Sequence, residues 1–280
     1  MRAAIHLRAA VVACAAAVGV AACRAPRGTA AADGPLRVLV YNIHAGKDAG
    51  GVDNLARVAA IVRESGADVA LLQEVDVRTE RSGRVDQVAE LARLTGMHAT
   101  FGKSLDFQGG EYGIAVLSRW PVASREVIPL VTDPLPTRSN GAREPRVAVR
   151  AALRAPGGTL ALMNTHIDAS REESFRLQEA ARLVAASRDT SPGGPRVALA
   201  GGDLNSEPES RTQAVLREGG WRDLWPECGA GDGRSYPARA PTKRIDYLYA
   251  VADVRCDRAE VLATEASDHR PVLFTIRIRR

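Results

Sequence analysis

The stretch Arg196-Val197-Ala198-Leu199-Ala200-Gly201-Gly202-Asp203-Leu204-Asn205 shows the pattern that decides the fold. Its apolar first half, 196–200, is typical of a buried strand. The two glycines permit close backbone approach or a positive φ, and Asp203 and Asn205 can point to one side. Such a pair could hold a nucleophilic water. Taken alone, however, the stretch is better explained as an Asx-rich turn after a strand.

The same pattern of an apolar run ended by polar side chains recurs along the chain. The other clusters are Asn42, Gln73-Glu74, Asn164-Thr165-His166 and Asp268-His269. Buried strands have little reason to end repeatedly in carboxylates, amides and imidazoles unless these groups converge on something charged. We therefore predict a site for a divalent metal ion and a phosphate, since carboxylates are the natural ligands of hard cations.

Asp246 is flanked by apolar strand residues and would be costly to bury without a partner. It pairs either with Arg244 or with a histidine, or it faces the site. The sequence contains no P-loop, no zinc-like Cys/His spacing and no Gly-x-Ser-x-Gly elbow. Nucleotide-binding ATPases and serine hydrolases of those types are therefore not supported.

The composition is that of an ordinary globular protein with one large core, at 280 residues, 45% hydrophobic and 25% charged. The apolar run 9–22 follows a basic start and is too short to span a bilayer. Val20-Ala21-Ala22-Cys23 resembles a bacterial lipobox. We predict a signal peptide over 1–22 with Cys23 as the lipid-modified first mature residue, the alternative being an ordinary secretory signal.

Residues 23–34, rich in Ala, Gly and Pro, are expected to form a flexible tether to a single domain at 35–280. The formal net charge of +5 falls to +3 without the two leader arginines, which is too small to indicate a nucleic-acid binder. Export would permit a bridge between Cys228 and Cys256, but two buried thiols fit the sequence equally well.

Strand-like and helical runs alternate at both ends of the chain, whereas the middle lacks a helical pattern and favours antiparallel strands. Helices are predicted near 54–64, 172–187 and 210–218, and strands near 36–41, 67–73, 111–119, 124–130, 146–154, 159–163, 196–200, 245–250 and 271–278. This mixture indicates sheets packed on one another with helices outside. Arg146, Arg150 and Arg154 alternate with apolar residues, and a solvated face is favoured over a nucleic-acid track.

Seven motifs in order resemble the endonuclease/exonuclease/phosphatase superfamily, whose fold is like that of deoxyribonuclease I. They are Tyr41-Asn42-Ile43-His44, Leu72-Gln73-Glu74-Val75-Asp76, Tyr112-Gly113-Ile114-Ala115-Val116-Leu117-Ser118, Asn164-Thr165-His166, Gly202-Asp203-Leu204-Asn205, Arg244-Ile245-Asp246-Tyr247 and Ser267-Asp268-His269. The resemblance covers about residues 36–277. It implies an α/β fold, a four-layered α/β/β/α sandwich with two mixed sheets face to face and helices outside.

The resemblance also implies a division of roles. Asn42, Glu74 and Asp268 would hold Mg²⁺ or Mn²⁺. Asp203 would orient or deprotonate the attacking water, with Asn205 on a phosphate oxygen or the metal.

The remaining implied roles concern the phosphate. His166 and His269 would contact phosphoryl oxygens, with His269 oriented by Asp268 or a neighbouring carboxylate and His166 by Asp246. Tyr112 and Asn164 would bind substrate.

The function that these expectations favour is hydrolysis of a phosphodiester by activated water, in a nucleic acid or a phospholipid head group. A phosphomonoesterase acting on a sugar or lipid phosphate is the alternative, and an inactive surface binding module is a third. The protein is expected to be a monomer, exported and held at the membrane through Cys23.

Overall fold

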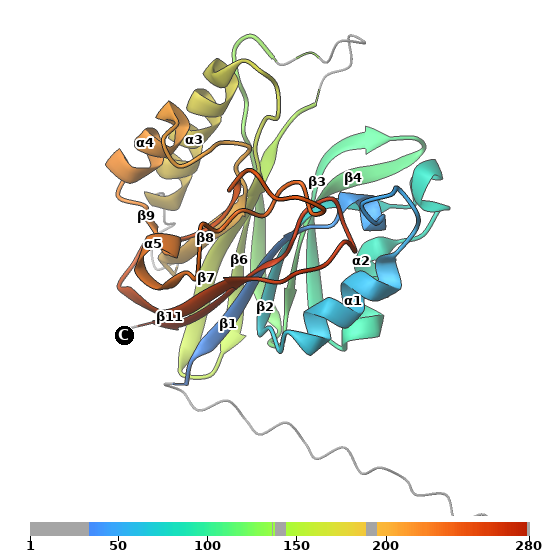
Figure 1. Ribbon diagram of the computed structural model, residues 1–280, viewed down its shortest axis with the longest axis horizontal. Coiled ribbons are helices and arrows are strands. Elements are labelled where there is room, and N and C mark those ends of the chain that lie inside the picture. The colour runs from blue at the N-terminus through green and yellow to red at the C-terminus, as the bar shows by residue number, and fades with distance from the viewer. Residues whose placement is uncertain (1–33, 136, 138–143, 189–194, 279–280) are drawn as a thin grey trace, which may run out of the picture. The chain divides into compact units, whose positions relative to one another are not determined.

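The computed structural model describes residues 34–135, 137, 144–188 and 195–278 (Figure 1). The predicted signal peptide at 1–22, and the tether apart from residue 34, lie outside the described residues. Within the described ranges, no helix is both long and apolar enough to cross a bilayer.

The described chain forms two six-stranded mixed sheets. The first sheet has the order β11 (Val254–Val261), β12 (Val272–Ile278), β1 (Leu36–Asn42), β2 (Val69–Val77), β4 (Gly110–Ser118) and β3 (His98–Phe107). The second has the order β5 (Val122–Pro129), β6 (Val147–Ala155), β7 (Gly158–His166), β8 (Val197–Asp203), β10 (Asp246–Ala250) and β9 (Arg222–Asp223). Each sheet contains one parallel pair, β1 with β2 and β7 with β8.

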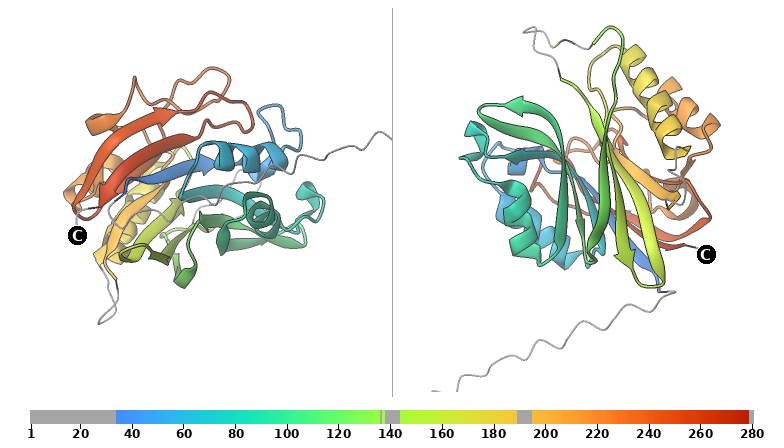
Figure 2. Two further views of the ribbon diagram at one scale, coloured as in Figure 1. Left: turned by 90° about the horizontal axis from the view of Figure 1, so that it is seen from below. Right: turned by 180° about the vertical axis from the view of Figure 1, so that it is seen from behind.

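Helices cover the outer face of each sheet, as the two further views show (Figure 2). Helices α1 (Leu55–Glu64) and α2 (Gln87–Thr95) pack on the first sheet, and α3 (Glu173–Arg188) and α4 (Arg211–Glu218) pack on the second. A central apolar layer, which includes Val38, Val149 and Phe274, joins the two sheets. The expected four-layered α/β/β/α sandwich is confirmed.

Strand β2 runs past the predicted end of its strand, through Glu74 to Val77. Helix α2 and strands β3 and β11 were not predicted from the sequence. Strand β3 is only partly buried and shows no strict alternation, which explains why periodicity did not reveal it. Strand β4 pairs with β2 and β3, so the chain crosses to the second sheet between β4 and β5.

The expectation that Arg146, Arg150 and Arg154 form a solvated row is wrong for the first two. Helix α3 lies over this end of β6, and Arg150 donates from Nη2 to the carbonyl of Ala186 at 2.6 Å. Arg146 is only 4% exposed, whereas Arg154 is exposed. Periodicity identified the shared face but not the helix that covers it.

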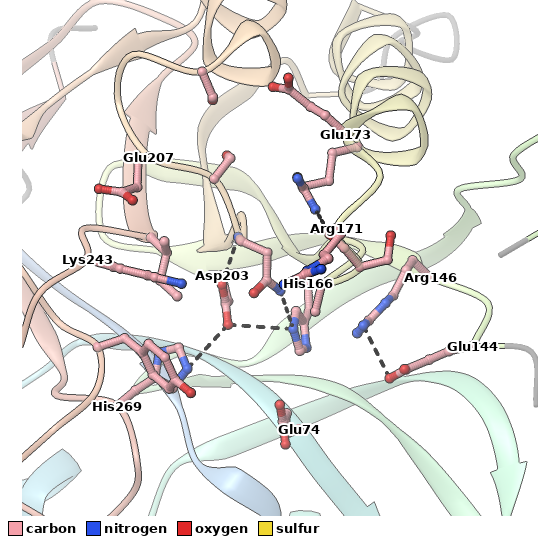
Figure 3. Close-up of a pocket in the computed structure, with 18 of the residues that line it drawn as sticks. Glu74, Glu144, Arg146, His166, Arg171, Glu173, Asp203, Glu207, Lys243 and His269 are labelled. Carbon is pink, nitrogen blue, oxygen red and sulfur yellow. Dashed lines mark hydrogen bonds and ion pairs between the residues drawn. The ribbon is translucent and has the colours of Figure 1, made fainter. Parts of the chain in front are cut away.

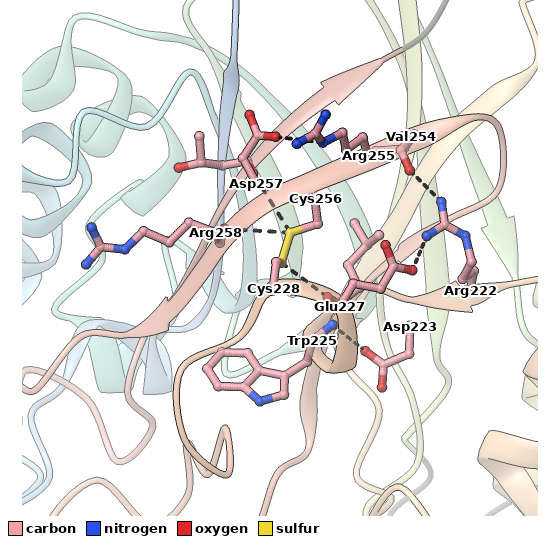
Figure 4. Close-up of a disulfide and its surroundings, with 12 residues drawn as sticks. Arg222, Asp223, Trp225, Glu227, Cys228, Val254, Arg255, Cys256, Asp257 and Arg258 are labelled. Carbon is pink, nitrogen blue, oxygen red and sulfur yellow. Dashed lines mark hydrogen bonds and ion pairs between the residues drawn. A yellow bond between two sulfur atoms is a disulfide. The ribbon is translucent and has the colours of Figure 1, made fainter.

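Cys228 and Cys256 form a disulfide, with their Cα atoms 5.7 Å apart (Figure 4). The bond connects the short helix α5 (Trp225–Cys228) to the edge strand β11. It closes a loop that contains β10, the strand that carries Asp246.

Asn164 links the two sheets through their buried layer. Its Nδ2 donates to the carbonyls of Leu72 and Ala115 in the first sheet, at 2.9 and 2.8 Å. Its Oδ1 accepts from Nε2 of Gln73 at 2.7 Å. Asn164 is fully buried with these three hydrogen bonds, so its predicted role in binding substrate is wrong. It is a structural cross-link.

Replacing Asn164 with Ala is expected to destabilise the protein by about 2–4 kcal/mol, because buried donors and acceptors on the first sheet lose their partner. Urea denaturation of the domain measures the change. Thr159→Ala, at an exposed position of the same strand, serves as the control and should shift stability by less than about 0.5 kcal/mol. A similarly small change for Asn164→Ala would contradict the cross-link.

Candidate active site

Polar residues at the ends of three neighbouring strands of the second sheet lie side by side at one end of that sheet. Asp203 of β8 pairs directly with His166 of β7 on one side and with Asp246 of β10 on the other. Beside them lies a cavity of about 700 Å³ (Figure 3). Its lining includes Glu74, His166, Asp203, Asn205, Asp268 and His269. The structure therefore brings these six predicted site residues together.

Asp203 stands at the centre of this group and is only 1% exposed. Its Oδ2 accepts from Nδ2 of Asn42 at 3.0 Å and lies 3.6 Å from Nε2 of both His166 and His269. Burial raises the pKa of the Asp203 carboxyl to about 7, although the charge of His269 acts to lower it. A carboxyl in this range can exchange a proton near neutral pH.

Gly202 allows β8 to approach β7 this closely. Its φ is 141°, and a Cβ atom at this position would lie 1.9 Å from the carbonyl oxygen of Thr165. No other residue type fits without moving β7, so this glycine sets the distance between Asp203 and His166. The sequence-based expectation of close backbone approach is confirmed here.

His269 is held by Asp246, whose Oδ2 accepts from Nδ1 of the imidazole at 2.9 Å. The hydroxyl of Ser235 also donates to this carboxylate oxygen. Burial acts to lower the pKa of His269, but the negative charges of Asp246 and Asp203 outweigh it and raise the pKa to about 10. His269 is thus an imidazolium at neutral pH, with Nε2 turned toward Asp203.

The predicted pairing of Asp246 with His166 is wrong. The register places both residues beside Asp203 but on opposite strands, and Asp246 turns to His269 instead. Arg244, the other candidate partner, pairs with Asp223 at 2.6 Å.

His166 is oriented by Asn205. The side-chain amide of Asn205 donates to Nε2 of His166 and to the carbonyl of Ile167, each at 3.0 Å. The backbone N–H of Asn205 donates to Oδ1 of Asp203 at 2.9 Å, as in an Asx-turn. This turn holds Asn205 at a φ of 42° and brings its side chain over the pocket.

Glu74 enters the cavity from the first sheet at a β-bulge. The pairing of β2 with β4 shifts register between Leu72 and Val75, and Glu74 has a φ of 57°. The bulge turns the side chain of Glu74 out of the strand pattern. Oε1 of Glu74 accepts from Nδ2 of Asn42 at 3.2 Å, the same nitrogen that bonds Asp203.

The donor set suits a hard divalent cation. Carboxylate oxygens of Glu74, Asp203 and Asp268 line one cavity, and the first two converge on a single amide nitrogen. Nδ2 of Asn42, not its Oδ1, faces Glu74 and Asp203, so the amide would have to rotate for its oxygen to bind a cation between them. Within the described residues, Asp203, Asp246 and His269 also form a compact group with ligand atoms within 4.8 Å.

Tyr112 is not among the described residues that line the cavity, and its contact with phosphate stays a prediction. Its ring lies under the guanidinium of Arg81, 5.3 Å from the centroid, and against Phe107. Tyr236 lines the cavity instead, with its ring 4.7 Å from that of His269. Lys243 also lines it. No sequence pattern marked these two residues, because both lie in an irregular loop.

The fold is that of a class whose members are hydrolases that act on phosphoesters. The sequence model of the Endonuclease/Exonuclease/phosphatase family matches residues 39–269, and the chain belongs to this family. The family is dependent on divalent metal ions.

Several known proteins have a similar fold, but their sequences are only distantly similar to that of this chain. YbhP of Escherichia coli strain K12, itself uncharacterized, is 25% identical over 255 residues, 86% of this chain and 96% of YbhP. A family member from Bacteroides thetaiotaomicron has a TM-score of 0.73 at 18% identity, covering 88% of this chain and 95% of its own. The mannosyl-6-phosphatase of Bacteroides thetaiotaomicron VPI-5482 has a TM-score of 0.68 at 17% identity, covering 86% and 99%.

The loop that follows His166 is held from helix α3 by Glu179. Oε2 of Glu179 accepts from the backbone N–H of Asp168 at 2.7 Å, and Arg176 donates to the carbonyls of Asp168 and Ser170. Glu179 is fully buried, and its burial raises the pKa of the carboxyl to about 8. It is therefore largely protonated at neutral pH.

The buried Glu179 is expected to make the protein less stable as pH rises from about 4.5 to about 8. Its folded pKa is above its unfolded pKa, so its contribution is present in full below 4.5 and is lost as the carboxyl ionises. The free energy of unfolding, measured in urea, should fall between pH 5 and pH 8.5 in the wild-type protein. In Glu179→Gln this fall should be smaller by about 3–5 kcal/mol. Glu218→Gln, at an exposed helix position, should keep the wild-type dependence; an unchanged profile in Glu179→Gln would contradict the assignment.

Proposed function

We propose that the protein is a divalent-metal-dependent phosphoesterase that hydrolyses a phosphodiester by activating water. One observation carries the proposal. The buried carboxylate of Asp203 lies within 3.6 Å of both His166 and His269, at a cavity that Glu74 enters from the opposite sheet. A base, two imidazoles and a hard-cation ligand thus face one space.

Asp203 is the general base in this proposal. Its pKa of about 7 allows it to accept a proton from a water molecule near neutral pH. The imidazolium of His269 presents Nε2 to the same space and stabilises negative charge on a phosphoryl oxygen. Protonation of His166 at Nε2 would turn that nitrogen into a second donor, and it would break the hydrogen bond that Nε2 accepts from Nδ2 of Asn205.

We assign the metal to Glu74 and Asp268, with Asn42 as a third ligand if its amide rotates. The compact group of Asp203, Asp246 and His269 is a weaker candidate, because Asp246 and His269 already use their facing atoms on each other. When bound, Mg²⁺ or Mn²⁺ acts as a Lewis acid that neutralises charge on the phosphoryl group.

For the substrate, we propose a phosphodiester in a nucleic acid or in a phospholipid head group. The alternative is a phosphomonoester of a sugar or lipid, and the similar fold of a mannosyl-6-phosphatase makes it a specific competitor. Fold alone does not choose between them.

Glu74→Gln is expected to lower metal-dependent hydrolysis of bis-(p-nitrophenyl) phosphate by about 10²–10³-fold, because a charged ligand is lost. The assay uses residues 34–280 with Mg²⁺, Mn²⁺ or EDTA, and Glu172→Gln, an exposed neighbour of the cavity, as the control. Activity on p-nitrophenyl phosphate alone would favour the monoesterase. If neither compound nor the natural diesters are turned over with any metal, the inactive surface binding module is the function that remains.

We also propose that the protein is exported as a monomer and anchored to the membrane by a lipid on Cys23. The disulfide supports an oxidising compartment, where such bonds persist. Full-length protein made in a bacterial host should partition into the membrane fraction and incorporate radiolabelled palmitate. Cys23→Ser should abolish both, whereas Cys14→Ser in the leader should have no effect; palmitate incorporation that survives Cys23→Ser would contradict the anchor.

A further inference from the structure

Arg146 extends the row of functional side chains along the edge of the second sheet. Asp203 pairs with His166 across β8 and β7, and Ala148 of β6 pairs with Thr165 of β7. Arg146, two residues before Ala148, therefore lies beside the end of β7 where His166 stands. Adjacent strands are about 4.8 Å apart, so the Arg146 backbone lies roughly 10 Å along the edge from that of Asp203.

The guanidinium of Arg146 is buried yet lines the active-site cavity. Arg146 is 4% exposed, and its side chain extends toward the same space as His166 and Glu74 (Figure 3). In the described residues its ion-pair partner is Glu144, at 3.3 Å from Nη2. Its buried Nε has no acceptor in the part of the chain that the structure describes.

Among the described residues, the buried Nε of Arg146 therefore lacks an acceptor, which a bound ligand could supply. A guanidinium has five N–H donors in a rigid plane, and a buried donor without an acceptor is costly. The proposed reaction does not use Arg146, because the base, the two imidazoles and the metal ligands are all other residues of the cavity. The planar fork matches the oxygens of a phosphate group, which it binds through two parallel hydrogen bonds.

We propose that Arg146 is a specificity-determining residue that binds a second phosphate group of the substrate, next to the phosphate that is hydrolysed. This inference rests on the proposed phosphoesterase function. The second phosphate is either the next phosphate of a nucleic-acid strand or a further phosphate on a small molecule. Glu144 holds the guanidinium in place until that phosphate arrives.

Two pairs of substrates, each differing by one phosphate, test the assignment with residues 34–280 and Mg²⁺. One pair is a thymidine dinucleotide with and without a 5′-phosphate. The other is adenosine 3′,5′-bisphosphate and adenosine 5′-monophosphate. In the wild-type protein the second phosphate should raise kcat/KM about tenfold or more, mainly through KM.

Arg146→Gln should bring the two members of each pair to within about twofold of one another, whereas Arg154→Gln, exposed on the same strand, should keep the wild-type preference. Circular dichroism and thermal unfolding check that both variants fold. If Arg146→Gln does not fold, the wild-type comparison decides, and Arg146→Lys, which keeps the charge but not the fork, should show a reduced preference.

Preference in the dinucleotide pair alone identifies a nucleic-acid strand, and preference in the adenosine pair alone identifies a small phosphorylated molecule. No preference in either pair overturns the assignment, as does a preference that survives in Arg146→Gln. If wild type hydrolyses none of the four compounds, nor bis-(p-nitrophenyl) phosphate or the natural diesters, the proposed function fails by itself. Calorimetric binding of the same pairs with Mg²⁺ then decides the role of Arg146 without turnover.

Discussion

The burial of the Asp203 carboxylate is the constraint on which the rest of the site depends. A carboxylate removed from water is unstable unless neighbouring groups donate hydrogen bonds or carry positive charge. Asn42 from the first sheet, His166 from the second and His269 from the loop before β12 all reach the same oxygen. These groups come from distant parts of the chain, so the carboxylate is satisfied only when both sheets are in their final positions.

The packing of the sheets is itself held by polar groups inside an apolar layer. Asn164 reaches across to two backbone carbonyls and to Gln73, which directly precedes Glu74. A fully hydrogen-bonded buried network favours one relative position of its parts, because any other position leaves donors and acceptors unpaired. The link therefore supports the bulge that presents Glu74.

Strained backbone accompanies the functional side chains. Glu74 and Asn205 both have positive φ, a conformation that costs free energy for residues other than glycine. In each case a specific feature maintains it, the bulge of β2 for Glu74 and the Asx-turn on Asp203 for Asn205. Both side chains thereby reach the cavity from positions where a regular strand or turn would direct them elsewhere.

The sequence by itself determined the layers and most of the chemistry, because periodicity and strand-end polarity are local properties. Runs such as 36–41 and 172–187 identified β1 and α3, and the order of the motifs identified the clusters around Asp203 and Glu74. Partly buried β3 and the loop residues Tyr236 and Lys243 carried no such local pattern. Only the tertiary structure decided that Asp246 holds His269, that Asn164 joins the sheets, and that α3 buries Arg146 at the cavity. These outcomes depend on strand pairing and packing between residues far apart in the chain, which no local spacing encodes.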